Sequence, residues 1–199
     1  MPVWQALHAE LVSHGFSLFA VALEHDAAAV RPFVEAAAAT FPVVLDPERV
    51  VAEAFAMINV PTVVWIDEDG RVVRAPDVAF ASDAFIGFHG VESAPHTAAL
   101  RRWVTTGVLP DDSPDDGVHR APSHEEQLAR AHLAVAREAH RRGEEVVVRW
   151  HIARAAALAP DDWTIRRGTM PWLGVDPMTS DEFVALFAEW SEAGRKYYR

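Results

Sequence analysis

Short β-rich runs alternate with helical patterns over residues 1–108, and this alternation constrains the fold more than any other feature of the sequence. The run FSLFAVAL (16–23) is apolar without interruption, which is typical of a strand buried on both faces. FPVVLD (41–46) predicts a second short strand. Strands that alternate with helices indicate an α/β domain with parallel strand pairing.

Four helices are predicted around these strands. In the first, Val3, Leu7 and Leu11 recur at helical spacing with Trp4 beside them, and Gly15 follows as a stop. A second helix is indicated by Val30, Phe33, Val34 and Ala37, with Pro32 in its first turn or at a kink. A third covers Pro47–Met57, with Val50, Val51 and Phe55 on one side. The fourth covers residues 95–106 and includes Leu100, Trp103 and Val104.

A β-hairpin is predicted directly after Pro61. Thr62–Ile66 is its first strand, Asp67–Gly70 its turn and Arg71–Val73 its second strand. Taken alone, Pro61 fits an ordinary trans proline at the start of a strand, where the missing N–H costs little.

Composition excludes several classes of function. The chain has 199 residues, half of them hydrophobic, which is enough for one or two domains with a buried core. A net charge of −11 disfavours binding to nucleic acid and to anionic lipid. No stretch approaches the ~20 apolar residues of a membrane span, and the N-terminus lacks a signal-peptide pattern. A cytoplasmic protein without a nucleic-acid or membrane partner is therefore expected.

The chain contains no cysteine. Disulfides, thiolate metal sites and thiol chemistry within these residues are excluded. Of the ten histidines, none forms the His-x-x-x-His or HExxH spacing of a metal site, and His132 and His140 are two helical turns apart. Surface histidines, with no metal and no cofactor, are the expected interpretation.

The remainder of the chain is predicted to be a linker followed by helices. Residues 109–123 are rich in Pro, Asp and Ser and indicate a solvated linker, since their acidic cluster fails the EF-hand spacing. In the extension 124–199, one helix ends at Gly143 and a second at Ala159-Pro160. A capping box from Thr179 to Glu182 is predicted to start the last helix, on which Phe183, Leu186, Phe187 and Trp190 share a face.

The helical pair at 124–160 resembles a single tetratricopeptide repeat, with a small residue at Ala155 and a closing Pro160. One such repeat cannot bury its own face. Two interpretations remain open: the face packs against the rest of the chain, or it forms a groove for a protein partner.

Three stretches carry a family pattern. Residues 1–24 contain Met-Pro ahead of a helix and a strand, residues 41–73 contain Asp-Pro, Val-Pro-Thr and Asp-x-x-Gly-x-Val in order, and HTAALRRWV (96–104) fits a closing helix. Together they resemble the thioredoxin-like superfamily, especially the TlpA/ResA-type thiol–disulfide oxidoreductases and their redoxin relatives. The resemblance covers residues 1–107.

The resemblance implies a substrate-binding site but no catalytic residue in this chain. Pro61 would be the cis-proline that faces the active site, and Val60 would pair with an extended substrate. Val60, Pro61, Thr62 and Trp4 are the expected substrate-binding residues. Pro2 would lie with Trp4 on the helix whose N-terminus stabilises the reactive anion.

The sequence departs from the family at its start. The family's first strand and the CxxC after it would precede Met1, so the resemblance implies a thioredoxin-like fold without its first strand, in residues 1–108, followed by an all-α extension. Over nearly its whole length the chain also resembles a bacterial group with a Trp-Ala-x-x-Sec-Gly-Pro motif, in which a UGA codon encodes the reactive selenocysteine. Three explanations stay open: a selenoprotein whose start is misplaced by that codon, a lost cysteine motif with a wrongly chosen start, and a homologue without redox activity.

The function implied is a thiol- or selenol-disulfide oxidoreductase or peroxide-reducing domain, with antioxidant or redox-homeostasis roles, whose redox centre is absent from this chain. Its substrate would be a disulfide-bearing protein or a peroxide. The alternative is a non-catalytic binding module that uses the cis-proline groove and the helical hairpin.

Overall fold

The structure, a computed structural model, describes residues 1–78, 83, 86, 92–110 and 121–194. The chain divides into two compact units, Met1–Val118 and His119–Arg199. Most of the predicted linker (111–120) lies outside the described residues.

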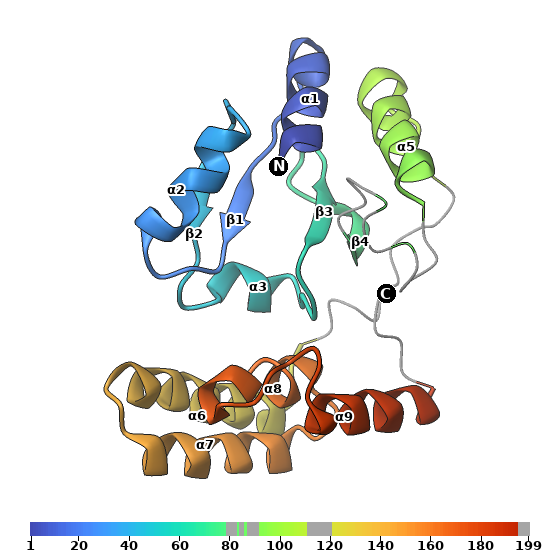
Figure 1. Cartoon of the computed structure of the whole chain (residues 1–199). Helices are drawn as coiled ribbons and strands as arrows, with labels where there is room; N and C mark the ends of the chain where they lie inside the picture. The colour runs from blue at the N-terminus through green and yellow to red at the C-terminus, as the bar shows by residue number, and fades with distance from the viewer. Residues whose placement is uncertain (79–82, 84–85, 87–91, 111–120, 195–199) are drawn as a thin grey trace. The chain divides into compact units, whose positions relative to one another are not determined.

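The first unit alternates helices and strands (Figure 1). Its elements are α1 (Pro2–Leu11), a 3₁₀ turn at Val12–His14, β1 (Ala20–Ala22), α2 (Ala27–Ala36), β2 (Val43–Leu45), α3 (Val50–Ala54), β3 (Thr62–Ile66), β4 (Val72–Val78) and α5 (Ser93–Thr106).

The strands form two separate sheets among the described residues. β1 and β2 are parallel, with Val21 opposite Val44, whereas β3 and β4 are antiparallel, with Trp65 opposite Arg74. Parallel pairing and the hairpin are therefore confirmed, although the second strand of the hairpin, expected over Arg71–Val73, extends from Val72 to Val78. The hairpin turns at Gly70, whose φ of +80° favours glycine, and the Asp67 carboxylate accepts hydrogen bonds from the Asp69 and Arg71 N–H groups.

The prediction of a doubly buried strand at 16–23 is wrong. The strand is limited to Ala20–Ala22, no residue of the run is fully buried, and Phe19 is 65% exposed. The physical reason is that β1 has a neighbour on one edge only within the described residues.

Two helix predictions also need correction. Pro32 lies inside α2, so the first of its two predicted places, the first turn, is wrong, and Phe33, one of the apolar residues that indicated this helix, is 69% exposed. The helix expected over Pro47–Met57 is limited to Val50–Ala54. Left-handed backbone at Arg49 (φ +61°) and Ala56 (φ +50°) confines it at both ends.

The core of the first unit joins α1, the β3–β4 hairpin and α5. Leu7 and Leu11 of α1 pack against Trp65 of β3 and Leu100 of α5. On the surface, Arg101 of α5 donates hydrogen bonds to both carboxylate oxygens of Glu10 and holds the pKa of that carboxyl below its usual value.

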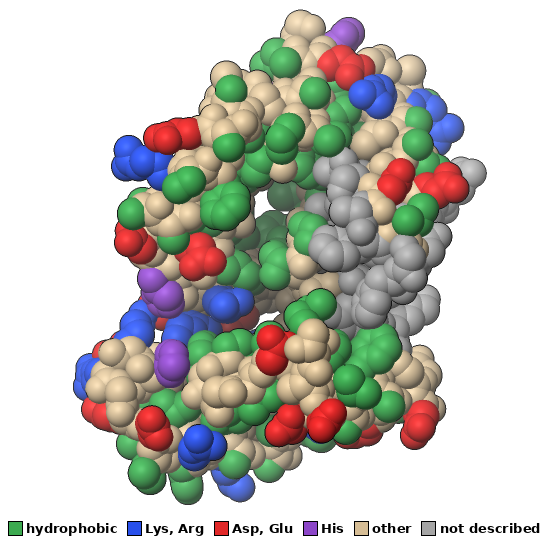
Figure 2. Space-filling view, in the orientation of Figure 1, with side chains coloured by type: hydrophobic (Ala, Val, Ile, Leu, Met, Phe, Trp, Pro, Cys, Tyr) green, Lys and Arg blue, Asp and Glu red, His purple; other side chains and the backbone are tan. Residues whose placement is uncertain are grey.

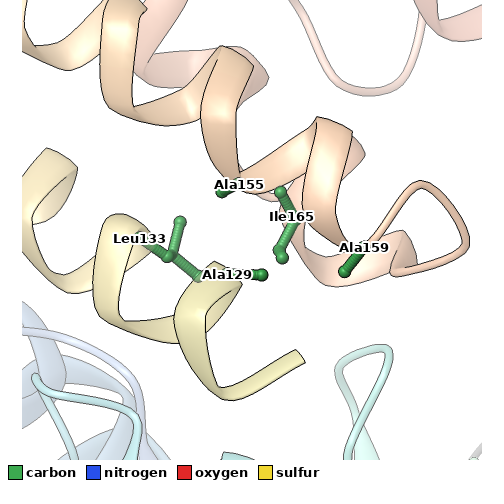
Figure 3. Close-up of a cluster of buried hydrophobic side chains, with 5 residues drawn as sticks. All are labelled: Ala129, Leu133, Ala155, Ala159 and Ile165. Carbon is green, nitrogen blue, oxygen red and sulfur yellow. The ribbon is translucent and has the colours of Figure 1, made fainter. Parts of the chain in front are cut away.

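The second unit is helical in its described residues. It contains α6 (His124–Arg141), α7 (Glu145–Leu158), α8 (Trp163–Arg166), a 3₁₀ turn at Met170–Leu173 and α9 (Asp181–Glu192). The predicted three helices are present, but α8 and the 3₁₀ turn were not expected. Figure 3 shows small residues of α6 and α7 meeting Ile165 of α8, and the cluster comprises Ala129, Leu133, Ala155, Ala159 and Ile165.

The caps of these helices differ from the prediction. Ser180, not Thr179, starts α9, because its side chain accepts a hydrogen bond from the Phe183 N–H. A reciprocal capping box instead starts α6, between Ser123 and Glu126. The inner face of α9 is as predicted, with Phe183, Leu186 and Trp190 buried.

Candidate functional site

Pro61 and its neighbours form the candidate substrate-binding segment at the start of β3. The Val60–Pro61 peptide bond is cis, as expected. Val60 is 62% exposed, Pro61 is exposed and Thr62 is half-buried. The Thr62 hydroxyl donates a hydrogen bond to the Asn59 carbonyl, which fixes the backbone on either side of the Val60–Pro61 pair.

A buried carboxylate fixes the approach of the chain to this segment. Asp46 follows β2, is almost fully buried, and accepts hydrogen bonds from the N–H groups of Val50, Val51 and Ala52. These are the first N–H groups of α3, which lack partners inside the helix. Asp46 therefore ties α3, and the loop after it, to the end of β2.

Trp4 lies on α1 and is half-buried. It packs against the cluster of Leu7, Leu11, Trp65 and Leu100 rather than standing free of it. The structure therefore places Trp4 on the edge of the core, and its role in substrate binding stays a prediction.

Two tryptophan rings and one arginine form a stack between the β3–β4 hairpin and α5. The rings of Trp65 and Trp103 stack with centroids 5.1 Å apart, and the Arg74 guanidinium lies 5.1 Å from the Trp65 ring centroid. Cations over an indole face are attracted by the quadrupole of the ring. The stack packs the β3–β4 hairpin, which begins directly after the Val60–Pro61 segment, against α5.

One feature of the described residues was not expected from the sequence. It is a histidine pair, His132 of α6 and His151 of α7, whose Nδ1 atoms lie 2.8 Å apart. Spacing within one helix does not reveal this pair, because it is formed between two helices. No group of three or more His, Cys, Asp or Glu side chains that could hold a metal ion occurs in the described part of the chain.

Comparison with known proteins found a match within the first unit. Residues 1–75 match the AhpC/TSA family, a redoxin family of the thioredoxin-like superfamily. The matched residues include α1, β1–β3 and the Val60–Pro61 segment. No curated protein and no solved structure matches the chain. Within the described residues, no helix is both long and apolar enough to cross a bilayer.

Proposed function

We propose that this chain is the substrate-binding scaffold of a redoxin-type oxidoreductase whose reactive selenocysteine or cysteine is not among residues 1–199. The observation that carries the proposal is the exposed Val60 beside Pro61, inside a region that matches the AhpC/TSA family. An exposed backbone segment of this kind can pair with an extended peptide, as in β-strand addition.

The chemistry requires a nucleophile that the sequence lacks. A selenolate or thiolate attacks one sulfur of a substrate disulfide, the S–S bond breaks, and the departing thiolate takes up a proton. A thiol reductant then attacks the mixed bond at the enzyme's selenium or sulfur and releases the second substrate thiol, and a second thiol frees the enzyme's nucleophile, so that the reductant leaves as a disulfide. With a peroxide, the same nucleophile attacks one oxygen, the O–O bond breaks, and two equivalents of thiol regenerate the reduced enzyme with loss of water.

Selenium and sulfur place different demands on the protein. A thiol needs a lowered pKa to be ionised at neutral pH, and a helix N-terminus is one source of that shift. A selenol is ionised at neutral pH without that help. The helix available for this purpose is α1, which begins at Pro2.

A binding module without redox chemistry is the second candidate. The absence of cysteine from the sequence favours it, because neither His nor Asp forms a mixed disulfide. In that case Val60–Pro61 would bind an extended peptide without turnover, and the α6–α7 hairpin would offer a second surface for a protein partner.

The test is to extend the protein with the in-frame codons upstream of Met1, write any UGA as Cys, and measure turnover of a peptide disulfide and of hydrogen peroxide with excess thiol. The proposal expects activity in the extended form. It also expects Val60→Pro, which removes a backbone N–H, to raise the KM for the peptide disulfide, whereas Val60→Ala leaves it unchanged. The proposal is contradicted if folded Val60→Pro and Val60→Ala proteins have equal KM values, or if the extended protein shows no turnover.

A further inference from the structure

Helix α7 carries apolar side chains on its outer face as well as on its inner one. Val148, Ile152 and Ala155 are buried in clusters shared with α6. The opposite side of α7 holds four exposed residues at the spacing i, i+4, i+7 and i+11, namely Val146, Trp150, Ala153 and Ala157. Figure 2 shows hydrophobic side chains at the surface along the lower edge of this unit, where Figure 1 draws α7. These four residues are called here the α7 stripe.

The α7 stripe is unusually apolar for a helix surface that faces solvent. Val146 is 83% exposed and Trp150 is 59% exposed. On α6, Leu128 and Val135 flank His132, which contacts Trp150, and they are 40% and 44% exposed. A helix that is apolar around its circumference is typical of one buried on all sides. A continuous exposed apolar patch of this kind marks an interaction surface.

Trp150 is held in one orientation at the centre of this surface. Its ring lies edge to face against His151 and His132, with centroids 4.7 Å and 5.6 Å away. A side chain that is already fixed in the free protein loses less conformational entropy when a partner covers it. Tryptophan is also enriched among the residues that contribute most to binding energy in protein interfaces. Trp150 is therefore a preformed anchor for a partner.

The α7 stripe is complementary to itself in size. Its large side chains, Val146 and Trp150, come first along the helix, and its small ones, Ala153 and Ala157, follow. The pairs 146 with 157 and 150 with 153 share one midpoint, so two copies of α7 that pack antiparallel about that point place each large side chain opposite a small one, as good packing requires. A parallel pair would instead place Trp150 on Trp150. This fit favours a second copy, because the surface for an unrelated protein need not match itself.

The charges beside the stripe permit the antiparallel pairing. Arg149 and Arg154 are both exposed, and the turn of about 100° per residue places them on opposite sides of the stripe. About a two-fold axis across the helices, each side of one stripe meets the same side of the other, so Arg149 of one copy does not meet Arg154 of the second. The like charges that share a side lie at the exposed rim, where water and salt screen them.

The area of this surface is that of a weak dimer. α7 has 14 residues, a length of about 21 Å, and with α6 beside it the surface is roughly 20 Å wide. The footprint is therefore about 400 Å² on each copy, which is at the weak, transient end of specific interfaces. Each copy also carries a net charge of −11, so mutual repulsion opposes association and added salt should favour it.

We infer that the α7 stripe is a self-association surface, on which α7 of a second copy packs antiparallel with Trp150 of each copy opposite Ala153 of the other. This inference goes beyond the proposed function and does not rest on it, since every residue involved lies in the second unit and none takes part in redox chemistry. The dimer would stand even if the proposed oxidoreductase function were refuted.

The first test is sedimentation of the full chain over roughly 10–500 µM, where a reversible monomer–dimer equilibrium is expected. Ala153→Glu places a charge against the indole of the second copy and should raise the dimer Kd at least about tenfold. Ala185→Glu adds the same charge at an exposed position of α9 and should keep the wild-type Kd. Circular dichroism checks that both variants are folded.

Three outcomes of this test would overturn the inference. The first is a monomer at every concentration, and the second is the same Kd for Ala153→Glu and Ala185→Glu. The third is a dimer that dissociates as salt is added, because charges rather than the apolar stripe would then hold it together.

The second test reads the orientation through disulfides, since the chain has no cysteine of its own. Antiparallel packing places Val146 of one copy opposite Ala157 of the other, whereas two Val146 residues lie about 16 Å apart along the helix axis. A disulfide requires Cα atoms within about 7 Å. An equimolar mixture of Val146→Cys and Ala157→Cys proteins should therefore oxidise mainly to the mixed dimer. A statistical mixture, or an excess of the two symmetric dimers, would overturn the antiparallel arrangement.

Discussion

His132 and His151 face each other across the α6–α7 hairpin with their Nδ1 atoms 2.8 Å apart. Trp150 lies edge to face against both rings, with centroids 5.6 Å from His132 and 4.7 Å from His151. Two imidazole nitrogens at this distance share one proton, since one must donate and the other accept. Protonation of both rings would bring two positive charges into contact.

The pair makes stability depend on pH. Burial, and then the positive charge of His132, hold the pKa of His151 below its ordinary value. Below pH ~6.5 the unfolded chain therefore binds more protons at this position than the folded chain. This contribution to stability is complete above that pH and is lost as pH falls through the lowered pKa of the folded state. Urea unfolding at pH 7.5 and pH 5.0 should show the loss.

His151→Gln should reduce the difference in the free energy of unfolding between pH 7.5 and pH 5.0, because the group that titrates is removed. His124→Gln, at the exposed start of α6, is the matched control and should keep the wild-type pH dependence. If His151→Gln and His124→Gln have the same pH profile, the histidine pair is not the source of the effect.

Trp190→Ala should lower the free energy of unfolding by about 3–5 kcal/mol, as for other buried large-to-small changes. Trp190 is only 6% exposed, and its ring lies 4.9 Å from that of Trp163, centroid to centroid. Val184→Ala on the exposed side of α9 should cost less than about 0.5 kcal/mol. A loss below ~0.5 kcal/mol for Trp190→Ala would mean that this face of α9 is not core.

Asp46→Ala should destabilise the first unit by about 1–2 kcal/mol, the range for loss of a helix cap. The change leaves three N–H groups of α3 without their carboxylate. Asp26→Ala, which removes a single bond to the Ala28 N–H at the start of α2, should cost less. If Asp46→Ala and Asp26→Ala lose the same stability in thermal unfolding, the role assigned to Asp46 is contradicted.

The hairpin and its turn were predictable because local residue types determine them, whereas the cis bond at Pro61 was expected only from the family resemblance. Val-Pro-Thr, the apolar strand and Asp-x-x-Gly stand together in 59–73, and the structure follows that order. The inner face of α9 was predictable for the same reason, since helical spacing decides which residues meet the core.

The remaining features depend on contacts between distant parts of the chain. The run 16–23 has the composition of a doubly buried strand, yet the number of its neighbours is a tertiary property that composition does not reveal. To predict the His132–His151 pair, one would also need the register of the two antiparallel helices α6 and α7. The end of α3 depends on the left-handed backbone at Ala56, which is unusual for alanine and gives no sequence signal.

The chain of 199 residues should show no disulfide reductase or peroxidase activity. It contains no cysteine, and its histidines and carboxylates do not form mixed disulfides. Turnover of a model disulfide with excess thiol should equal the rate without protein. A rate above that background would mean that the chemistry does not require a thiol or selenol.

The central claim, a redoxin scaffold whose reactive residue lies outside this chain, is tested most directly by reading the DNA upstream of Met1 in the same frame. We predict an apolar strand followed by a Trp-Ala-type motif, with a UGA or Cys codon no more than roughly 20 codons from Met1. That limit is the number of residues needed for one strand and one turn, at the ~3.3 Å rise of strand residues. UGA would favour a selenoenzyme and Cys a thiol enzyme. A frame that holds neither an apolar strand nor such a codon contradicts the account and favours the binding module.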